Sequence, residues 1–216
     1  MDYSEIIVYI LEIIGTIAFA SSGALVGIRK KMDIFGVNVL GVTTAVGGGL
    51  IRDVVLDITP PNMFQHPSYT LMAIATSCLL FVFIYYNRAF LNSNHMERYE
   101  QAMNLADSLG LAAFTVIGIN TAIQASYGDR YFLMIFVGMI TGVGGGMMRD
   151  VMAGRLPYVF VKHVYACASM AGAIVCVLLR EVISDTNALI LGAVVIMVIR
   201  ILATYYKWNL PKIDVE

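Results

Sequence analysis

Two short segments of the sequence place charged residues directly after a run of glycines. Residues 47–53 read Gly-Gly-Gly-Leu-Ile-Arg-Asp, and residues 144–150 read Gly-Gly-Gly-Met-Met-Arg-Asp. Both lie in stretches apolar enough to cross a bilayer, where a buried Arg or Asp costs about 2.5 to 3.5 kcal/mol on insertion scales. Ionisable side chains at that depth typically mark a path for ions or polar solutes. We therefore expect transport chemistry and not an enzyme, since the sequence shows no nucleophile and base pair and no metal cluster.

Three adjacent glycines weaken a helix, because each costs about 1 kcal/mol relative to alanine in a helix interior. We expect the two helices to kink or unwind at these glycines and to expose backbone groups beside a polar path. The alternative is close helix packing through small residues. The occurrence of the triplet in two equivalent positions favours the interrupted helix. The glycines are Gly47, Gly48, Gly49, Gly144, Gly145 and Gly146.

Each triplet is followed by an Arg-Asp pair. Neighbouring residues on a helix point about 100° apart, so we do not expect the two members of a pair to bind each other. Arg52 and Arg149 would point into a shared cavity, and Asp53 and Asp150 would meet partners on other helices. The alternative is structural: the arginines reach interfacial water or phosphate and the acids cap the backbone. In a cation path the arginines would act as gates, hold lipid phosphates or be screened by the acids.

Further oxygen-bearing side chains lie in the same apolar stretches, where they could replace part of the hydration shell of a cation. Ser and Thr also bond to their own helix, so alone they are weak indicators. Glu12 and Asp107 lie near the ends of their helices, where water could solvate their carboxylates. The remaining candidates for the path are Ser21, Ser22, Thr43, Thr44, Asn120 and Thr141.

Two histidines follow prolines in the loops after the glycine segments, Pro60 with His66 and Pro157 with His163. A metal site needs several converging ligands, and an inverted topology places these histidines on opposite sides of the membrane. We expect no metal site and no resident cofactor. A structural or interfacial role is favoured over pH sensing.

The composition is that of a polytopic membrane protein. The 216 residues are 59% hydrophobic and 13% charged, and the mean hydropathy is +0.77. A net charge of −1 gives no indication of a nucleic-acid partner. We expect one all-α transmembrane domain over residues 1–216. Hydropathy predicts seven spans, at about 6–28, 34–57, 69–90, 104–126, 131–153, 160–182 and 184–206.

The loops between these spans differ in charge, and basic residues collect on the cytoplasmic side of membrane proteins. One side holds little beyond Arg130 and Arg180. This predicts an N-terminus outside and a C-terminus in the cytoplasm. The basic side holds Arg29, Lys30, Lys31, Arg88, Arg98, Arg155, Lys162, Lys207 and Lys212.

The two halves of the sequence are related. An offset of 97 residues aligns the two glycine segments, and an offset of 95 aligns Glu12 with Asp107. Each unit holds three spans, over about 5–90 and 101–182, so the second unit is inverted in the membrane and the span at 184–206 lies outside the repeat. Small and aromatic residues recur every four positions in the first span of each unit and predict a tight contact face. They are Gly15, Phe19 and Gly23, and Gly110, Phe114 and Gly118.

With seven spans and a doubled Gly-Gly-Gly-x-x-Arg-Asp-Val segment, the chain resembles the prokaryotic trimeric intracellular cation (TRIC) channels and the similar bacterial proteins labelled glycine transporters. The resemblance covers about residues 5–206. Animal TRIC channels have Lys-Glu-Val where this chain has Arg52-Asp53-Val54 and Arg149-Asp150-Val151. The resemblance implies a homotrimer in the inner membrane of a prokaryotic cell. It also implies one pore per protomer between glycine-kinked helices, which passes monovalent cations, chiefly potassium.

Two functions remain open at this point. In the first, potassium and to a lesser extent sodium pass between the first, second, fourth and fifth spans, constricted by Arg52 and Arg149. In the second, a carrier binds glycine or another small amino acid, with its carboxylate near an arginine or a helix N-terminus and its ammonium near an aspartate. A structural membrane component without transport activity is a third reading.

Overall fold

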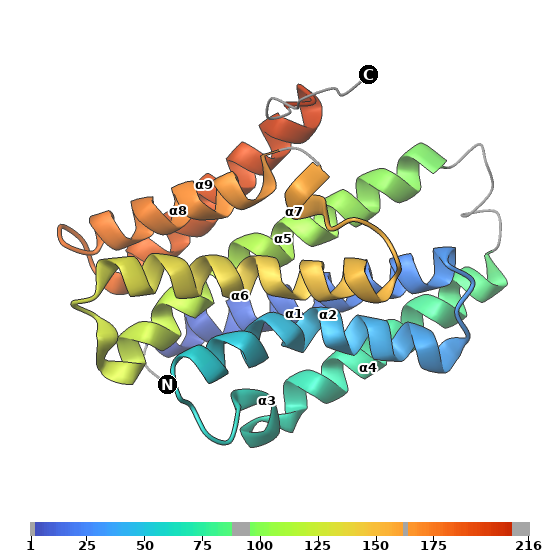
Figure 1. The fold of residues 1–216 in the computed structure, drawn as a ribbon, viewed down its shortest axis with the longest axis horizontal. Coiled ribbons are helices and arrows are strands. Elements are labelled where there is room, and N and C mark those ends of the chain that lie inside the picture. Colours follow the sequence, from blue (N-terminus) through green and yellow to red (C-terminus); the bar gives the residue numbers. More distant parts are fainter. Residues whose placement is uncertain (1–2, 88–95, 162–163, 209–216) are drawn as a thin grey trace.

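The computed structural model of the chain describes residues 3–87, 96–161 and 164–208 (Figure 1). The chain forms long helices that run back and forth, joined in two places by short ones. The long helices are α1 (Tyr3–Arg29), α2 (Ile34–Val55), α4 (Pro67–Tyr86), α5 (Met96–Ala122), α6 (Tyr131–Met152), α8 (Tyr165–Leu179) and α9 (Asp185–Tyr205). The short helices are α3 (Asn62–Gln65) and α7 (Tyr158–Val161), and a π-helical turn, η3 (Ile123–Tyr127), extends α5.

The predicted all-α membrane fold with seven spans is confirmed, with one span shorter than expected. All the long helices except α8 are long and apolar enough to cross a membrane, α5 doing so together with its π-helical turn. α8 has 15 residues, although a span over 160–182 was predicted. The reason is local: Val164 has a φ of 37°, in the left-handed region, and an α-helix of L-residues does not continue through it.

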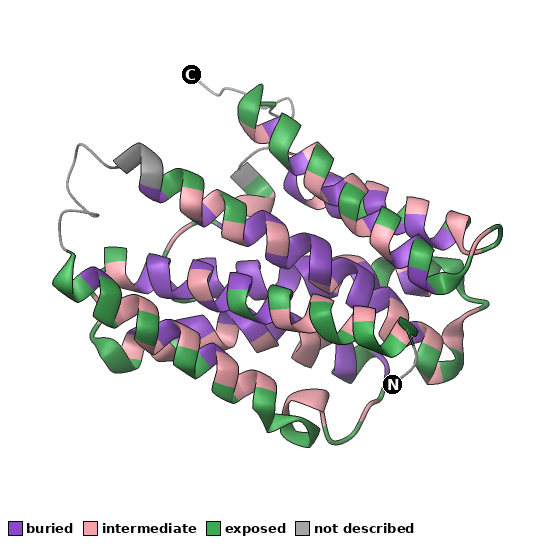
Figure 2. Cartoon of the chain, turned by 180° about the vertical axis from the view of Figure 1, so that it is seen from behind, coloured by how far each residue is buried: buried purple, intermediate pink, exposed green. Residues whose placement is uncertain are grey.

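Four helices form the centre of the bundle. α1 packs along α2 and α5 packs along α6, and the two pairs meet where α2 contacts α6 and α1 contacts α5. α4 covers α1 and α2 on one flank, while α8 covers α5 and α6 on the other and α9 packs on α5 and α8 (Figure 1). Figure 2 shows the buried residues gathered on the central helices. α1, α2 and α4 therefore correspond to α5, α6 and α8, and α9 is the additional helix.

α2 and α6 end in the same way, directly after their Arg-Asp pairs. The Leu56 N–H donates to the carbonyl of Arg52, and the Ala153 N–H donates to the carbonyl of Arg149. Both arginines thus stand in the last turn of their helix. The partial negative charge of the C-terminal carbonyl groups favours a cation there.

The glycine triplets do not interrupt their helices, so the prediction of unwound turns is wrong. α2 and α6 are continuous α-helices through all six glycines. Their backbones meet at this level: a Cβ on Gly48 would collide with the carbonyl oxygen of Thr141, and a Cβ on Gly145 would collide with that of Thr44. The absence of side chains lets the two helices cross in backbone contact, which is the close-packing alternative.

The predicted contact faces of α1 and α5 are confirmed. A Cβ on Gly110 would collide with the ring of Phe19, and a Cβ on Gly15 would lie 3.2 Å from the ring of Phe114. The two rings lie 5.3 Å apart between their centroids. Each phenylalanine therefore fills the space left by a glycine of the other helix, close to the middle of the bundle.

Candidate functional site

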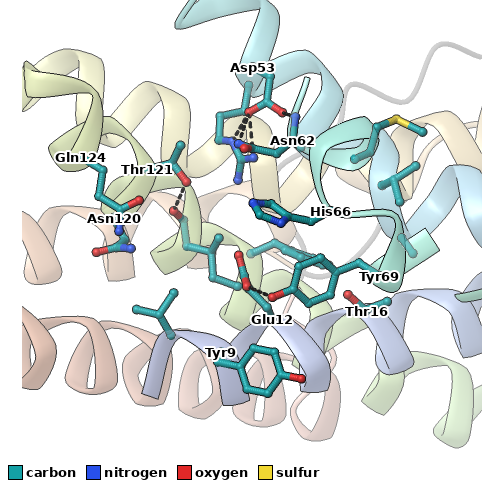
Figure 3. A pocket seen from close by; sticks show the side chains of 18 of the residues that line it. Tyr9, Glu12, Thr16, Asp53, Asn62, His66, Tyr69, Asn120, Thr121 and Gln124 are labelled. Carbon is teal, nitrogen blue, oxygen red and sulfur yellow. Dashed lines mark hydrogen bonds and ion pairs between the residues drawn. The ribbon is translucent and has the colours of Figure 1, made fainter. Parts of the chain in front are cut away.

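A cavity of about 600 Å³ lies at the end of the bundle at which α1 begins (Figure 3). Its walls come from α1, α2, α3, α4 and α5, and it extends to the middle of the bundle at Thr16, Ala45 and Phe114. We call it the N-side cavity. The charged side chains in its lining are three carboxylates, Glu5, Glu12 and Asp53, and one guanidinium, Arg52. The cavity is therefore net negative with His66 neutral, and a charged cleft of this sign concentrates cations.

One wall of the cavity is fixed by the Arg-Asp pair of α2. Arg52 Nε donates to Asp53 Oδ1 at 2.8 Å, and Arg52 Nη2 lies 2.7 Å from the same oxygen. The Asn62 N–H donates to Asp53 Oδ2 at 2.7 Å, which ties α3 to the end of α2. The expectation that neighbouring Arg and Asp do not bind each other is wrong here. In the last turn of a helix no following turn blocks the long Arg side chain, and it folds back onto its neighbour.

The opposite wall carries a second polar pair. The Tyr69 hydroxyl of α4 donates a hydrogen bond to Glu12 Oε2 of α1. Figure 3 shows His66 between this pair and the Asp53–Asn62 contact. The predicted loop histidine therefore faces the cavity, while His163 lies outside the described residues.

The Arg-Asp pair of α6 is completely buried at the other end of the bundle. Arg149 has no exposed surface, and its Nε donates to Asp150 Oδ1 at 2.8 Å. Its Nη1 donates to Asp107 Oδ1 of α5 and to Ser22 Oγ of α1, each at 2.5 Å. Arg155 Nη2 also lies 2.6 Å from Asp150 Oδ1. We call Ser22, Asp107, Arg149 and Asp150 the buried arginine cluster; it binds α1, α5 and α6 together.

The loop after α6 covers this cluster. The Tyr158 N–H donates to Asp150 Oδ2 at 2.9 Å, in the way that Asn62 binds Asp53 in the first repeat. The Tyr158 ring lies 5.5 Å from Arg149 Cζ and 4.7 Å from Arg155 Cζ. Burial raises the pKa of the Tyr158 phenol above its ordinary value, so the ring faces both arginines in its neutral form.

The N-side cavity and the buried arginine cluster are separated by aromatic and backbone contacts. Phe114 lines the cavity, and the fully buried Phe19 packs beneath it against Gly110, which lies one helical turn from Asp107. Phe19 also lies 3.2 Å from the position of a Cβ on Gly145 at the crossing of α2 and α6. The residues of the buried arginine cluster are not among those that line the cavity.

The predicted site residues do not gather in one place. Gly49, Arg52, Asp53 and Asn120 line the N-side cavity, and Ser22, Arg149 and Asp150 form most of the buried arginine cluster. Thr44 and Thr141 are buried and donate to the carbonyls of Leu40 and Val137 in their own helices, each at 2.6 Å. The other glycines lie at the helix contacts. Ser21 and Thr43 are half-buried and are not among the cavity-lining residues.

Sequence reasoning missed several residues of these sites. Tyr69 and Tyr165 occupy equivalent places in the two repeats, but they are 96 residues apart, and the change of one residue in the intervening loop hid the match. Arg200 of α9 is 2% exposed, donates from Nε to Ser108 Oγ at 3.2 Å and lies 4.8 Å from the Tyr165 ring. A lone arginine inside an apolar span was a usable signal.

Within the described part of the chain no three His, Cys, Asp or Glu residues are placed to hold a metal ion.

Comparison with known proteins identifies relatives over most of the chain. A family model described as glycine transporter matches residues 9–85 and 104–181. A UPF0126 membrane protein of Deinococcus radiodurans is 39% identical over 192 residues, which cover 88% of this chain and 84% of the relative. The UPF0126 inner membrane protein YadS of Escherichia coli K12 is 38% identical over 207 residues, 95% of each chain.

Several solved structures have the same fold as this chain. The structure of a TRIC cation channel, determined to explain its conductance, has a TM-score of 0.82 and 35% sequence identity to this chain. The match covers 96% of this chain and 97% of the channel chain. A prokaryotic TRIC channel crystallised in 0.5 M KCl has a TM-score of 0.84 and 32% identity, with 95% and 100% covered. A trimeric intracellular cation channel orthologue from Rhodobacter sphaeroides has a TM-score of 0.81 and 31% identity, with 92% and 98% covered.

Proposed function

Because this chain belongs to the family of the prokaryotic TRIC channels and the bacterial proteins described as glycine transporters, we propose that it conducts monovalent cations, chiefly potassium, across a membrane. Its relatives with solved structures are cation channels, and one of its sequence relatives is an inner membrane protein. The chain would lie in the inner membrane of a prokaryote, with the N-terminus outside and the C-terminus in the cytoplasm. It would assemble as a homotrimer with one pathway per protomer, like the trimeric orthologue from Rhodobacter sphaeroides.

The observation that carries this proposal is the charge of the N-side cavity. Three carboxylates and one guanidinium line a space that extends to the middle of the bundle. A cavity with a net negative lining, walled by apolar helices, raises the local concentration of cations and lowers that of anions. The side-chain oxygens of Thr16, Asn120 and Thr121 lie in the same lining and could replace part of the hydration shell of an ion.

The pathway would continue from the cavity between α1, α2, α5 and α6. It would pass Phe19 and Phe114 and reach the buried arginine cluster, where Arg149 would lie across the exit. The positive charge of Arg149 is offset by Asp107 and Asp150, both fully buried beside it. Conduction requires this cluster to open, so the arginine would act as a gate and not as a permanent barrier to cations.

Purified protein in a planar lipid bilayer tests the proposal. Under a potassium chloride gradient we expect unitary currents that reverse near the equilibrium potential of potassium. Empty bilayers and bilayers with heat-denatured protein serve as controls. A reversal near the chloride potential, or the absence of currents at every applied voltage, would refute cation conduction.

One observation favours a second candidate, a carrier for glycine or a similar zwitterion. The N-side cavity places a guanidinium and carboxylates in one lining, which suits a solute that carries both a carboxylate and an ammonium group. The carboxylate of the solute would bind near Arg52, and its ammonium would bind near Glu12. Saturable uptake of labelled glycine into proteoliposomes that carry no potassium current would establish this function instead.

A further inference from the structure

The two repeats hold the same three polar groups, but the groups are paired differently. Each repeat has an arginine at the end of its second helix, a carboxylate on its first helix and a tyrosine at the start of its third. In the first repeat these are Arg52, Glu12 and Tyr69. In the second they are Arg149, Asp107 and Tyr165.

In the second repeat the carboxylate binds the arginine. Asp107 Oδ1 accepts from Arg149 Nη1 at 2.5 Å, and both residues are fully buried. The Tyr165 hydroxyl is buried in the same place, since a Cβ on Gly146 would lie 3.1 Å from that hydroxyl and 3.6 Å from Asp107 Oδ1. It lies beside Asp107 but makes no hydrogen bond of good geometry within the described parts of the chain. This end of the bundle is closed.

In the first repeat the carboxylate binds the tyrosine. Glu12 accepts the hydrogen bond of the Tyr69 hydroxyl, and the guanidinium of Arg52 is paired with its neighbour Asp53. Arg52 and Glu12 line the same N-side cavity, with His66 between the walls that they belong to. This end of the bundle is open.

From this difference we propose that each repeat contains a gate in which one carboxylate exchanges partners. When Glu12 binds Tyr69, the N-side cavity is open; when Glu12 binds Arg52, it is closed, in the way that Asp107 and Arg149 close the other end. In the mirrored conformation Asp107 binds Tyr165, and Arg149 keeps only Asp150. Each repeat thus shows the conformation that the other repeat can adopt.

The chemistry of the groups fits such an exchange. A carboxylate bound to arginine is a charged pair that stays strong where water is excluded. A carboxylate bound to a tyrosine hydroxyl keeps its negative charge and needs water around it, so that arrangement belongs to a hydrated cavity. Glu12 is one methylene longer than Asp107 and can reach further from α1 toward α2. His66 and Glu5 share the cavity and are the other titratable groups that face this exchange.

This inference rests on the proposed function in one respect, because the gates would control the proposed cation pathway. The test measures thiol labelling and needs no transport measurement. The reporter is Asn120→Cys in the N-side cavity, placed in a chain that carries Cys78→Ala, Cys167→Ala and Cys176→Ala. The protein is reconstituted in lipid nanodiscs, where both faces are accessible. The rate of modification by a charged, membrane-impermeant thiol reagent then measures how often the cavity is open.

Tyr69→Phe removes the hydrogen bond that holds Glu12 in the open arrangement, so the labelling rate is expected to fall about fivefold. Adding Glu12→Gln to Tyr69→Phe is expected to restore the rate, because Arg52 then has no exchanging carboxylate to pair with. Tyr131→Phe is the matched control: its hydroxyl donates to Glu181 at 2.9 Å on the same face but outside the cavity. That variant is expected to label at the parent rate.

The outcomes are decisive in either direction. Slowed labelling in Tyr69→Phe with recovery in the double variant supports the exchange. A parent rate or a faster rate in Tyr69→Phe overturns it, and so does slow labelling that persists after Glu12→Gln, since local distortion alone would then explain the change. A chain that exchanges partners but conducts no cations would refute the proposed function and leave this inference standing.

Discussion

At the scale of single residues, the two arginines show how a guanidinium is kept inside an apolar bundle. Arg149 and Arg52 each bind the aspartate that follows them, and both aspartates are held by a backbone N–H from the next loop. The sequence led us to expect that the aspartates would meet partners on other helices, whereas each binds the arginine that precedes it. The rule that adjacent helical residues point apart describes helix interiors, and these pairs stand at helix ends. Partners from distant segments, such as Ser22, follow from the packing and not from local sequence.

We expect Arg149→Ala to destabilise the protein strongly. The change leaves the carboxylate of Asp107 buried without its cationic partner, and breaking a buried pair in this way costs about 3 to 5 kcal/mol. The melting temperature in detergent, followed by size-exclusion chromatography of heated samples, measures the loss. Arg29→Ala is the matched control, since its ion pair with Glu100 is 3.9 Å long and half exposed and contributes at most about 1 kcal/mol. Equal melting temperatures for the two variants would contradict the assigned role of the cluster.

Tyr165→Phe is expected to leave the melting temperature unchanged or to raise it. The Tyr165 hydroxyl is buried beside Asp107, and it makes no hydrogen bond of good geometry with any residue of the described segments. Removing a buried polar group that lacks a partner avoids a desolvation cost of about 1 to 3 kcal/mol. The same substitution removes the group that would hold Asp107 in the open arrangement, so unitary openings in a bilayer should become rarer. A clear drop in melting temperature would show that the hydroxyl is bonded.

At the scale of helices, the glycine triplets act through contact and not through flexibility. Their positions, their duplication and the order of the seven spans could be predicted from the sequence. The interrupted helix could not, because the local cost of glycine says nothing about the packing gained when two backbones touch. The length of α8 could not be predicted from hydropathy either. A window average does not detect the left-handed backbone conformation of Val164, which separates α8 from α7.

The two sides of a glycine triplet should respond differently to alanine. We expect Gly48→Ala to destabilise the bundle by about 1 to 3 kcal/mol, because its Cβ would collide with the Thr141 carbonyl and force α2 and α6 apart. Gly49→Ala is the control within the same motif: its Cβ would meet only the guanidinium of Arg52, with Nη2 at 3.6 Å, and helix propensity would improve by about 1 kcal/mol. Thermal unfolding of both variants in detergent tests the contrast. Greater damage from Gly49→Ala would favour an unwinding role for the glycines.

At the scale of the whole molecule, the inverted repeats make one chain with two unlike ends. One end has a carboxylate-lined cavity, and the other has its arginine paired with two aspartates. The duplication that was visible in the sequence predicted two equivalent sites but not their different conformations. Two repeats of similar sequence can adopt both arrangements, and a chain that opens one end while the other is closed holds them at the same time.

The central claim is that the carboxylates of the N-side cavity attract the permeating cations, and unitary conductance at two salt concentrations tests it most directly. In dilute potassium chloride, Glu5→Gln should reduce the potassium conductance, because one of the three lining carboxylates is lost. At about 1 M salt the effect should vanish, since the screening length falls to about 3 Å. Glu181→Gln, the same charge change on the same face outside the cavity, should conduct like the parent at both concentrations. Equal conductance of Glu5→Gln and the parent in dilute salt would contradict the claim that this cavity is the entrance to the cation pathway.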